Sequence, residues 1–496
     1  MDELIPLRDI NLKKLPQDIL IPQYDRSKLT AGIIHIGLGN FHRAHQAWYL
    51  HRLFNMRLCH DWAIIGASVM ETDIALQKKL KEQDYLTTLI ELDPLGKSAE
   101  ICGSIIDYLQ IEKDNASLIK RIAEADIRIV SLTITEGGYY LHPSNGDFDI
   151  NHPDILHDVQ NPQSPKTAFG AIVEACRLRK ENNIGPITGL SCDNLQENGD
   201  ILKRTILELA RLSNPELAQW IDKNCSFPNS MVDCIVPATK TEEIALVKEF
   251  GINDLSPVTH ENFRQWVIED NFCAGRPEWE KVGVIFSQNV HDFELMKLRI
   301  LNGGHQIISI PGELLGLNTI AETMAHPLIQ KFLNLTVKTE IIPHVKAVPN
   351  VRPLDYLELI EKRFNNPEIK DTTRRVAYDG SARQTNFLLP SIRDGLKNGS
   401  PISGLVLANV LWFKYCCGIR ENGTTISSNA PDWQERHEVA LKAKSNSKIW
   451  LAQHQIYGDL GTNTIFCKLF SIWAEEINQK GVEYAIQKYI SETTSE

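Results

Sequence analysis

The first part of the chain alternates short apolar runs with amphipathic helical patterns. The apolar runs are AGIIHIGLG (31–39), WAIIGASV (62–69), IRIVSLTIT (127–135) and ITGLSCD (187–193). Continuous apolar runs of this length, separated by helical patterns, are typical of buried parallel strands in βαβ units. Because such crossovers are right-handed, we expect an α/β fold with a Rossmann-like, doubly wound sheet.

Past about residue 285 the pattern changes to long stretches with helical spacing. Residues 294–315, 353–364 and 473–490 each repeat apolar positions every three or four residues. We therefore predict two domains: a Rossmann-like domain over residues 1–288 and a mostly α-helical C-terminal domain over residues 289–496.

The first predicted strand runs directly into GLGNFH (37–42), a GxGxxH pattern. Its two glycines permit a tight turn and the close approach of a pyrophosphate to a helix N-terminus. A histidine replaces the third, helix-packing glycine of the usual dinucleotide fingerprint. We predict that Gly37, Gly39, Asn40 and Phe41 contact a dinucleotide; the alternative is that the segment is only a turn.

Two acids follow the second predicted strand, Glu71 and Asp73. An acid in this region can bind the adenosine ribose hydroxyls of a dinucleotide, although both lie further along than the fingerprint expects. Since a carboxylate repels a 2′-phosphate, either residue favours NAD over NADP. The alternative is that both acids only begin the following helix.

Composition and charge exclude several classes of partner. The 496 residues carry a net charge of −11, which argues against nucleic acid because phosphate binding needs a basic surface. The acidic N-terminus does not resemble a secretory signal, and the longest apolar run, near GLVLANVLWF, is far shorter than the ~20 residues of a membrane helix. We expect a soluble, cytoplasmic protein that acts on a small molecule without nucleic acid or membrane.

A metal site is not predicted. His42 and His45 form an HxxH pattern that could place two imidazoles together on a helix. No third ligand is evident near them, so we interpret these histidines as facing the phosphate or substrate, or as structural.

The segment KLRILNGGH (297–305) places polar residues in an apolar context. If residues 292–305 form one α-helix at ~100° per residue, Glu294, Asn302 and His305 fall on the same side as Lys297. Leucines lie between them and would keep that side partly dry. A purely structural helix would bury aliphatic residues at these positions.

This set of side chains suits the oxidation of an alcohol. Desolvation drives a lysine toward its neutral form, so Lys297 can accept a hydroxyl proton. Asn302 and His305 can donate N–H groups to an alkoxide or a polarised carbonyl oxygen. Glu294 could pass protons to solvent while hydride leaves for a nicotinamide. The alternative is a lysine that extends along a surface helix with ordinary polar neighbours.

At this point the sequence resembles the mannitol dehydrogenase family, the polyol-specific long-chain dehydrogenases that include mannitol 2-dehydrogenase and fructuronate reductase. SLTITEGGY with SCDNLQENG is most similar to the mannitol 2-dehydrogenase branch. The matching segments, in order along the chain, are GLGNFHRAHQA (37–47), IVSLTITEGGYY (129–140), SPKTAFG (164–170), SCDNLQENG (191–199), SFPNSMVD (226–233), QWVIEDNF (265–272), GRPEWEKVG (275–283), KLRILNGGH (297–305) and, more loosely, DGSARQTNFLLPSI (379–392).

The resemblance implies a metal-independent, NAD-dependent dehydrogenase that is a monomer, with a dinucleotide-binding first domain and a substrate-binding, catalytic second domain. It implies Lys297 as general base, Asn302 and Asn194 as the oxyanion site, His305 as a substrate ligand and Glu294 as a proton gate.

The resemblance also implies substrate and cofactor contacts. Asp233 and Arg375 would contact substrate hydroxyls, Arg383 would lie in the same substrate site, and Asp73 would set the preference for NAD.

Some positions depart from the family pattern. Cys234 replaces the usual arginine after Asp233, and Gly303 and Gly304 occupy the middle of the N-x-S-H pattern. Arg383 and Thr385 replace the usual lysine and proline after DGS. These changes retain the base and the oxyanion groups but leave the substrate open.

We therefore expect interconversion of D-mannitol and D-fructose. A hexuronate reductase acting on fructuronate or mannonate and a D-arabinitol dehydrogenase are the close alternatives, and a non-catalytic NAD-binding sensor is the distant one. A uronate would need an added cation, for which Arg375 and Arg383 are candidates.

Overall fold

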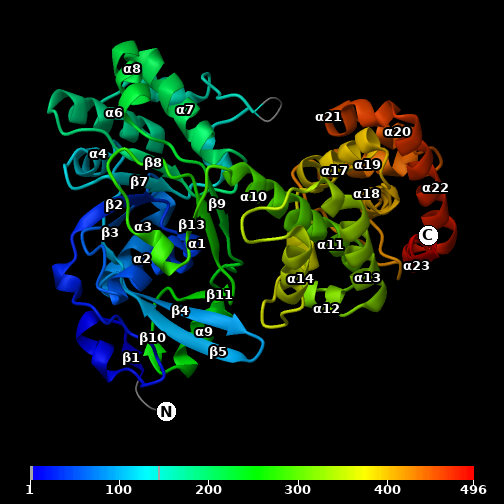
Figure 1. Cartoon of the computed structure of the whole chain (residues 1–496), viewed down its shortest axis with the longest axis horizontal. Helices are drawn as coiled ribbons and strands as arrows, with labels where there is room; N and C mark the ends of the chain where they lie inside the picture. Colours follow the sequence, from blue (N-terminus) through cyan, green and yellow to red (C-terminus); the bar gives the residue numbers. More distant parts are fainter. Residues whose placement is uncertain (1–3, 143–145, 496) are drawn as a thin grey trace. The chain divides into compact units, whose positions relative to one another are not determined.

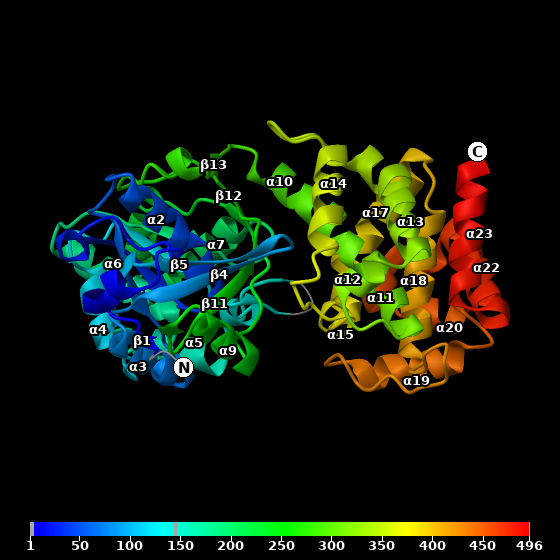
Figure 2. The same cartoon turned by 90° about the horizontal axis from the view of Figure 1, so that it is seen from below.

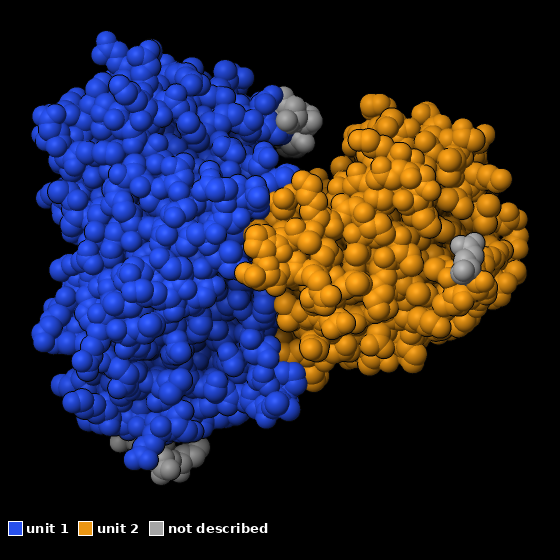
Figure 3. All heavy atoms as spheres, viewed as in Figure 1, with its two compact units in different colours: residues 1–291 blue, residues 292–496 orange. Residues whose placement is uncertain are grey.

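A computed structural model describes residues 4–142 and 146–495 of the chain. The chain divides into two compact units, which Figure 3 colours separately. Unit 1 comprises Met1–His291 and unit 2 comprises Asp292–Glu496.

Unit 1 is built on a five-stranded sheet in which every neighbouring pair is parallel (Figure 1). The strand order is β6-β3-β2-β7-β8, with β2 in the centre. The four predicted strands are confirmed, and the order places successive crossovers on both sides of β2, as a doubly wound fold requires. The strands are β2 Ala31–Ile36, β3 Ala63–Ala67, β6 Ile105–Tyr108, β7 Ile129–Leu132 and β8 Thr188–Ser191.

Alternate residues of the central strand face different layers of helices. Ile34 and Ile36 pack into a core with α4, α6 and α7, whereas Ile33 packs into a second core with α2. Both faces of the sheet are therefore buried, which explains why its strands read as continuous apolar runs.

Two helices, α1 and α2, follow the central strand directly. The helices of unit 1 are α1 Asn40–Ala44, α2 Gln46–Asn55, α3 Ile74–Glu82, α4 Ala116–Ile122, α5 Pro153–Gln160, α6 Ala168–Glu181, α7 Asn198–Ser213, α8 Pro215–Asn224 and α9 Thr241–Glu249. Short 3₁₀ turns occur at Asp9–Lys14, Arg26–Lys28, Glu71–Asp73, Glu136–Tyr139 and Trp279–Val282.

Smaller sheets complete unit 1, and the sequence patterns did not predict them. Their orders are β11-β4-β5, β13-β12-β9 and β1-β10. β4 and β5 form a hairpin of consecutive strands, whereas β1 pairs with β10 and β4 pairs with β11 across more than 150 residues, a pairing that local periodicity does not indicate. The strands are β1 Ile5–Pro6, β4 Thr87–Asp93, β5 Gly96–Cys102, β9 Ser230–Asp233, β10 Ile252–Asn253, β11 Val258–Glu261, β12 Gln265–Ile268 and β13 Ile285–Phe286.

Among its described residues, unit 2 contains helices and isolated bridges only (Figure 2). Its α-helices are α10 Val290–Met296, which begins two residues before the unit boundary, α11 Gly303–Leu315, α12 Ile320–Met324, α13 Pro327–Thr336, α14 Pro353–Phe364, α15 Thr373–Val376, α16 Gly380–Arg383, α17 Leu389–Asn398, α18 Ser403–Cys416, α19 Trp433–Ala443, α20 Lys448–Leu451, α21 His454–Tyr457, α22 Thr464–Lys480 and α23 Val482–Ser495. Three π-helical segments are η6 Lys297–Asn302, η7 Val337–Ile341 and η9 Gln384–Leu388, and 3₁₀ turns occur at Ile342–His344 and Gly458–Thr462.

Helix α18 is the central helix of unit 2. It contains the apolar run GLVLANVLWF, is buried along almost its whole length, and packs against α11, α13, α22 and α23. A helix that is apolar on all sides is expected at the centre of a helical core. Within residues 4–142 and 146–495, no helix combines the length and the apolar composition needed to span a bilayer.

Candidate active site

The turn after β2 needs glycine at its first position. Gly37 has φ +92°, and a Cβ there would lie 2.1 Å from the carbonyl oxygen of Thr133 at the end of β7. Gly39 is exposed, and a Cβ on it would meet only the Gly37 carbonyl oxygen, at 3.9 Å. The turn is thus pressed against the sheet at Gly37 and open at Gly39, where a ligand could approach the backbone.

The side chain of Asn40 anchors the turn within the protein. Its Nδ2 donates to Thr239 Oγ1 at 2.9 Å and to the Pro237 carbonyl at 3.2 Å, and its Oδ1 accepts from Arg43 at 2.7 Å. Arg43 is buried and also donates to the carbonyl of Ser256. Asn40 therefore offers a ligand its backbone N–H rather than its amide. Sequence reasoning missed Arg43, for which the only signal was its place in GNFHRAH.

The aromatic residues of this turn pack against one another. Phe41 is half-buried and stacks on His45 at 4.9 Å between ring centroids, while His42 stacks on His35 at 3.3 Å. Burial and then the neighbouring His35 lower the pKa of His42 well below its ordinary value. Both His42 and His45 are buried, so their interpretation as structural residues fits best. The described residues contain no group of three or more His, Cys, Asp or Glu side chains placed to hold a metal.

Asp73 is held at the carboxyl end of β3, next to the glycine turn. Ser68 donates its hydroxyl to Asp73 Oδ2 at 2.6 Å, and the Gly37 N–H donates to the Ala67 carbonyl at 2.9 Å. Glu71 lies in the same 3₁₀ turn but is exposed. The structure therefore brings Asp73 and the glycine turn to one edge of the sheet.

Asn194 follows β8 at this same edge, beside a buried acid that sequence reasoning did not single out. Asp193 accepts the backbone N–H groups of Ile134 at 3.1 Å and Thr135 at 2.8 Å, and the hydroxyl of Tyr139 at 2.8 Å. Burial raises the pKa of Asp193 to about 6. Asp193 thus links the TITEGGYY segment (133–140) by hydrogen bonds to the loop that carries the exposed Asn194.

Asp233 is the last residue of β9 and is buried. Its strand is linked to the Asp193 loop through Asn198, whose Nδ2 donates to the carbonyls of Asp193 at 3.0 Å and Ser230 at 2.9 Å. One network of buried polar groups therefore positions both Asn194 and Asp233 within unit 1.

In unit 2, the prediction of one regular α-helix over residues 292–305 was wrong. Helix α10 ends at Met296, Lys297–Asn302 forms a π-helical segment, and α11 starts at Gly303. A π turn joins residues five apart instead of four. Asn302 therefore lies one widened turn beyond Lys297, closer to the lysine's side of the helix than a 100° spacing implies.

The polar residues of this segment are largely buried. Lys297 is only 8% exposed, and Glu294 and His305 are also buried, whereas Asn302 is half-buried. The alternative of a lysine extending along the surface is thus wrong. Gly304 packs against Leu333, whose Cδ1 would lie 3.3 Å from an added Cβ, so this glycine permits close helix packing.

His305 is buried and stacks on Phe364 with ring centroids 4.1 Å apart. Burial lowers its pKa to about 3; nearby Asp371 opposes this shift, and Arg375, Arg363 and Arg383 add to it. Within the described residues its Nε2 has no hydrogen-bond partner. The imidazole is therefore neutral, with a ring nitrogen able to bind a ligand.

The two arginines that the sequence nominated for the substrate site lie near His305. Arg375 is on α15 and pairs with Asp371. Arg383 ends α16 and donates its Nε to the Tyr378 carbonyl at 2.6 Å. In unit 2 the structure thus gathers Lys297, Asn302 and His305 on one continuous helix, with the arginines around its histidine.

A parallel sheet with a glycine turn and an acid at the ends of its central strands defines a Rossmann-type unit, here followed by a helical unit. Residues 31–281 match the mannitol dehydrogenase Rossmann domain, and residues 289–478 match the mannitol dehydrogenase C-terminal domain. The chain belongs to the mannitol dehydrogenase family.

Similar proteins span nearly the whole chain. A mannitol 2-dehydrogenase from Cereibacter sphaeroides is 48% identical over 477 residues, covering 96% of this chain and 100% of the relative. One from Phaeosphaeria nodorum is 37% identical, covering 98% and 86% respectively.

Among solved structures, the Pseudomonas fluorescens mannitol 2-dehydrogenase ternary complex with NAD and D-mannitol has a TM-score of 0.87 at 37% identity, covering 98% of this chain and 99% of that one. A substrate-free D-sorbitol dehydrogenase has a TM-score of 0.89 at 32% identity, covering 97% and 99%.

Proposed function

We propose that this protein catalyses the NAD-dependent oxidation of D-mannitol to D-fructose and the reverse reduction. The observation that carries the proposal is the buried Lys297, placed with Asn302 and His305 on a helix that contains a π turn. Support comes from the family of both units and from the mannitol 2-dehydrogenase relatives.

Unit 1 fits a dinucleotide. The open backbone at Gly39, the tight turn at Gly37 and the first-turn N–H groups at Asn40 and Phe41 would hold the pyrophosphate. Asp73, fixed by Ser68, would accept the adenosine ribose hydroxyls, with Glu71 as the alternative. Bound NAD supplies the acceptor for the hydride that leaves the carbinol carbon.

Lys297 is the proposed general base that takes the proton from the reacting hydroxyl group. Asn302 and Asn194 are proposed to donate amide N–H groups to the oxygen as its negative charge develops. Neutral His305 orients the same region through its Nε2. Glu294, buried one helical turn before Lys297, is proposed to carry the proton onward to solvent.

Asp233, Arg375 and Arg383 are proposed to contact the remaining hydroxyl groups of the substrate. Carboxylate and guanidinium groups can together satisfy a polyol, which offers both donors and acceptors. In this assignment unit 1 binds the dinucleotide and unit 2 supplies the base. We also propose that the protein is a monomer, which light scattering at micromolar concentration tests.

The test is an NADH absorbance assay of the whole protein with NAD⁺ and a panel of substrates. The panel contains D-mannitol, D-sorbitol, D-arabinitol and D-mannonate. The proposal predicts the highest kcat/KM with D-mannitol, and the reverse reaction with D-fructose and NADH. Turnover of D-mannonate alone would contradict the proposal. A protein that binds NADH but turns over none of these compounds would also contradict it.

A further inference from the structure

A buried aspartate holds an exposed arginine beside the proposed substrate site. Both oxygens of Asp371 accept hydrogen bonds from Arg375: Nε reaches Oδ1 at 2.5 Å, and Nη2 reaches Oδ2. The Asp371 side chain is 6% exposed and the Arg375 side chain 64%. The buried carboxylate thus neutralises and orients the guanidinium through its Nε and Nη2 groups. The opposite edge of the guanidinium is left open to a ligand.

The surroundings of this pair are rich in positive charge. The charged groups that act on buried His305 are Asp371, Arg375, Arg363 and Arg383. Three of these are cations, and Asp371 is the anion among them. Without the charge of Asp371, the guanidinium of Arg375 would suit a negatively charged ligand.

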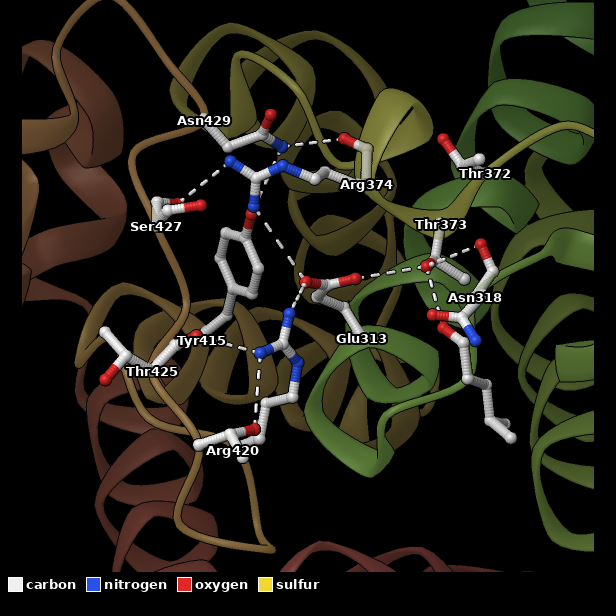
Figure 4. Close-up of polar contacts among 12 residues, drawn as sticks. Glu313, Asn318, Thr372, Thr373, Arg374, Tyr415, Arg420, Thr425, Ser427 and Asn429 are labelled. Carbon is white, nitrogen blue, oxygen red and sulfur yellow. Dashed lines mark hydrogen bonds and ion pairs between the residues drawn. The ribbon is translucent and has the colours of Figure 1, made fainter.

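The position of the pair does not depend on the pair itself. Glu313 lies on the same helix as His305, and Figure 4 shows that it contacts Thr373, a residue of the segment between Asp371 and Arg375. Thr373 donates to Glu313 Oε2 at 3.1 Å and to the Leu317 carbonyl at 2.8 Å, and Arg420 binds Glu313 Oε1 at 2.6 Å.

The residue next to Arg375 is fixed independently as well. Arg374 donates to the Ser427 carbonyl at 3.2 Å, and its own carbonyl accepts from Asn429 at 2.7 Å (Figure 4). Loss of the Asp371 charge should therefore change the electrostatics of the site more than its geometry.

We infer that Asp371 is a specificity-determining residue: by pairing with Arg375 it makes that guanidinium a binder of neutral hydroxyl groups and disfavours substrates that carry a carboxylate. The inference rests on the proposed function and narrows it, because it explains how a site with several arginines selects a neutral polyol over the corresponding sugar acid.

The primary test is Asp371→Asn, which keeps the shape of the side chain and one acceptor oxygen. The ratio of kcat/KM for D-mannonate to kcat/KM for D-mannitol should rise about tenfold or more, since an unbalanced cation attracts a carboxylate at short range. The matched control is Asp355→Asn in α14, because Asp355 forms the same two-bond pair with Arg352 at 2.6 and 2.8 Å. The control should leave the ratio unchanged.

A second variant, at Arg375, keeps the test decisive if Asp371→Asn folds poorly. Arg375→Gln leaves the Asp371 carboxylate unbalanced, so the acid-to-polyol ratio should fall below that of the wild type. In the double variant Asp371→Asn/Arg375→Gln, the gain for D-mannonate should disappear.

The outcomes separate this inference from the proposed function. Wild-type turnover of D-mannitol reports on the function, and the change of the ratio among variants reports on Asp371. Equal losses for both substrates in Asp371→Asn, or a ratio that rises in Arg375→Gln, would overturn the inference even if the wild type oxidises D-mannitol.

Discussion

Lys297 and Asn302 are the first and last residues of one π-helical segment, so a single widened turn separates them. This segment packs against two further π-helical segments of unit 2, η7 and η9. π turns occur often at functional sites, because they change the register of side chains along a helix. Here the change brings an amide toward the side of a buried lysine.

This relationship predicts that Asn302 stabilises developing negative charge. Asn302→Ala should lower kcat about 10²- to 10³-fold, as loss of one oxyanion donor does in other enzymes, and leave NADH affinity unchanged. Steady-state kinetics and NADH fluorescence titration measure the two quantities. Asn334→Ala in α13, which removes an amide bonded to Glu361 at 2.6 Å, is the control. An equal loss in both variants would assign Asn302 a structural role.

Asp73 is predicted to set the preference for NAD over NADP. Asp73→Ala should reduce the ratio of kcat/KM for NAD to that for NADP by about tenfold or more, because like charges a few ångströms apart repel by roughly 1–4 kcal/mol. Ser68→Ala, which removes the 2.6 Å hydrogen bond to Asp73, should reduce it less. If Glu71→Ala lowers the ratio and Asp73→Ala does not, Glu71 is the ribose contact.

His305 is predicted to remain neutral throughout the working pH range. Burial lowers its pKa to about 3, so the imidazole loses its proton far below neutrality. His305→Gln should lower kcat/KM about 10- to 100-fold and leave the shape of its pH profile between pH 5 and 8 unchanged. A wild-type inflection in this range that disappears in the variant would show that His305 titrates there.

Glu340 is predicted to make unit 2 less stable as pH rises. It accepts the N–H groups of Gly404 and Leu405 at the start of α18 at 2.7 and 2.8 Å, and the Tyr489 hydroxyl at 3.0 Å. Burial raises its pKa from 4.5 to about 7. Between these values the folded protein holds a proton that the unfolded chain has released, so the stabilisation present at low pH is lost as pH rises through 7.

The measurement is the midpoint of thermal unfolding at pH 5 and pH 8. Glu340→Gln should unfold at a lower temperature than the wild type at pH 5. The difference in unfolding free energy between the two proteins should be smaller at pH 8, by at most a few kcal/mol, since one pKa unit corresponds to about 1.4 kcal/mol. The exposed Glu475→Gln serves as control for removal of a charge. A gap that is the same at both pH values would refute the assignment.

Four of the five strands of the parallel sheet could be predicted from the sequence, because each is marked by a local apolar run; β6 was not predicted. Ile33 and Ile34 face opposite cores, so both must be apolar, and the same holds for Ile64 and Ile65 in β3 and for Ile129 and Val130 in β7. The helix at 353–364 was predicted with its bounds for a similar reason, since its apolar face repeats every three to four residues and Pro353 begins it.

Other features depend on contacts that local patterns do not record. The side chain of Asn40 is anchored by Thr239, 199 residues away, so the local sequence did not show that this side chain is engaged within the protein. Residues 297–302 read equally well as α-helix in the sequence, whereas in the structure they form a π-helical segment that packs against η7 and η9. Gly481, with φ +87°, divides the helical pattern at 473–490 into α22 and α23.

The central claim is that Lys297 is the general base, and the most direct measurement compares Lys297→Ala with the wild type under saturating NAD⁺ and D-mannitol. The account predicts a fall in the rate of hydride transfer of ~10²- to 10⁴-fold at neutral pH, with NADH affinity unchanged and with exposed Lys331→Ala as active as the wild type. A Lys297→Ala protein that oxidises D-mannitol at the wild-type rate would contradict it.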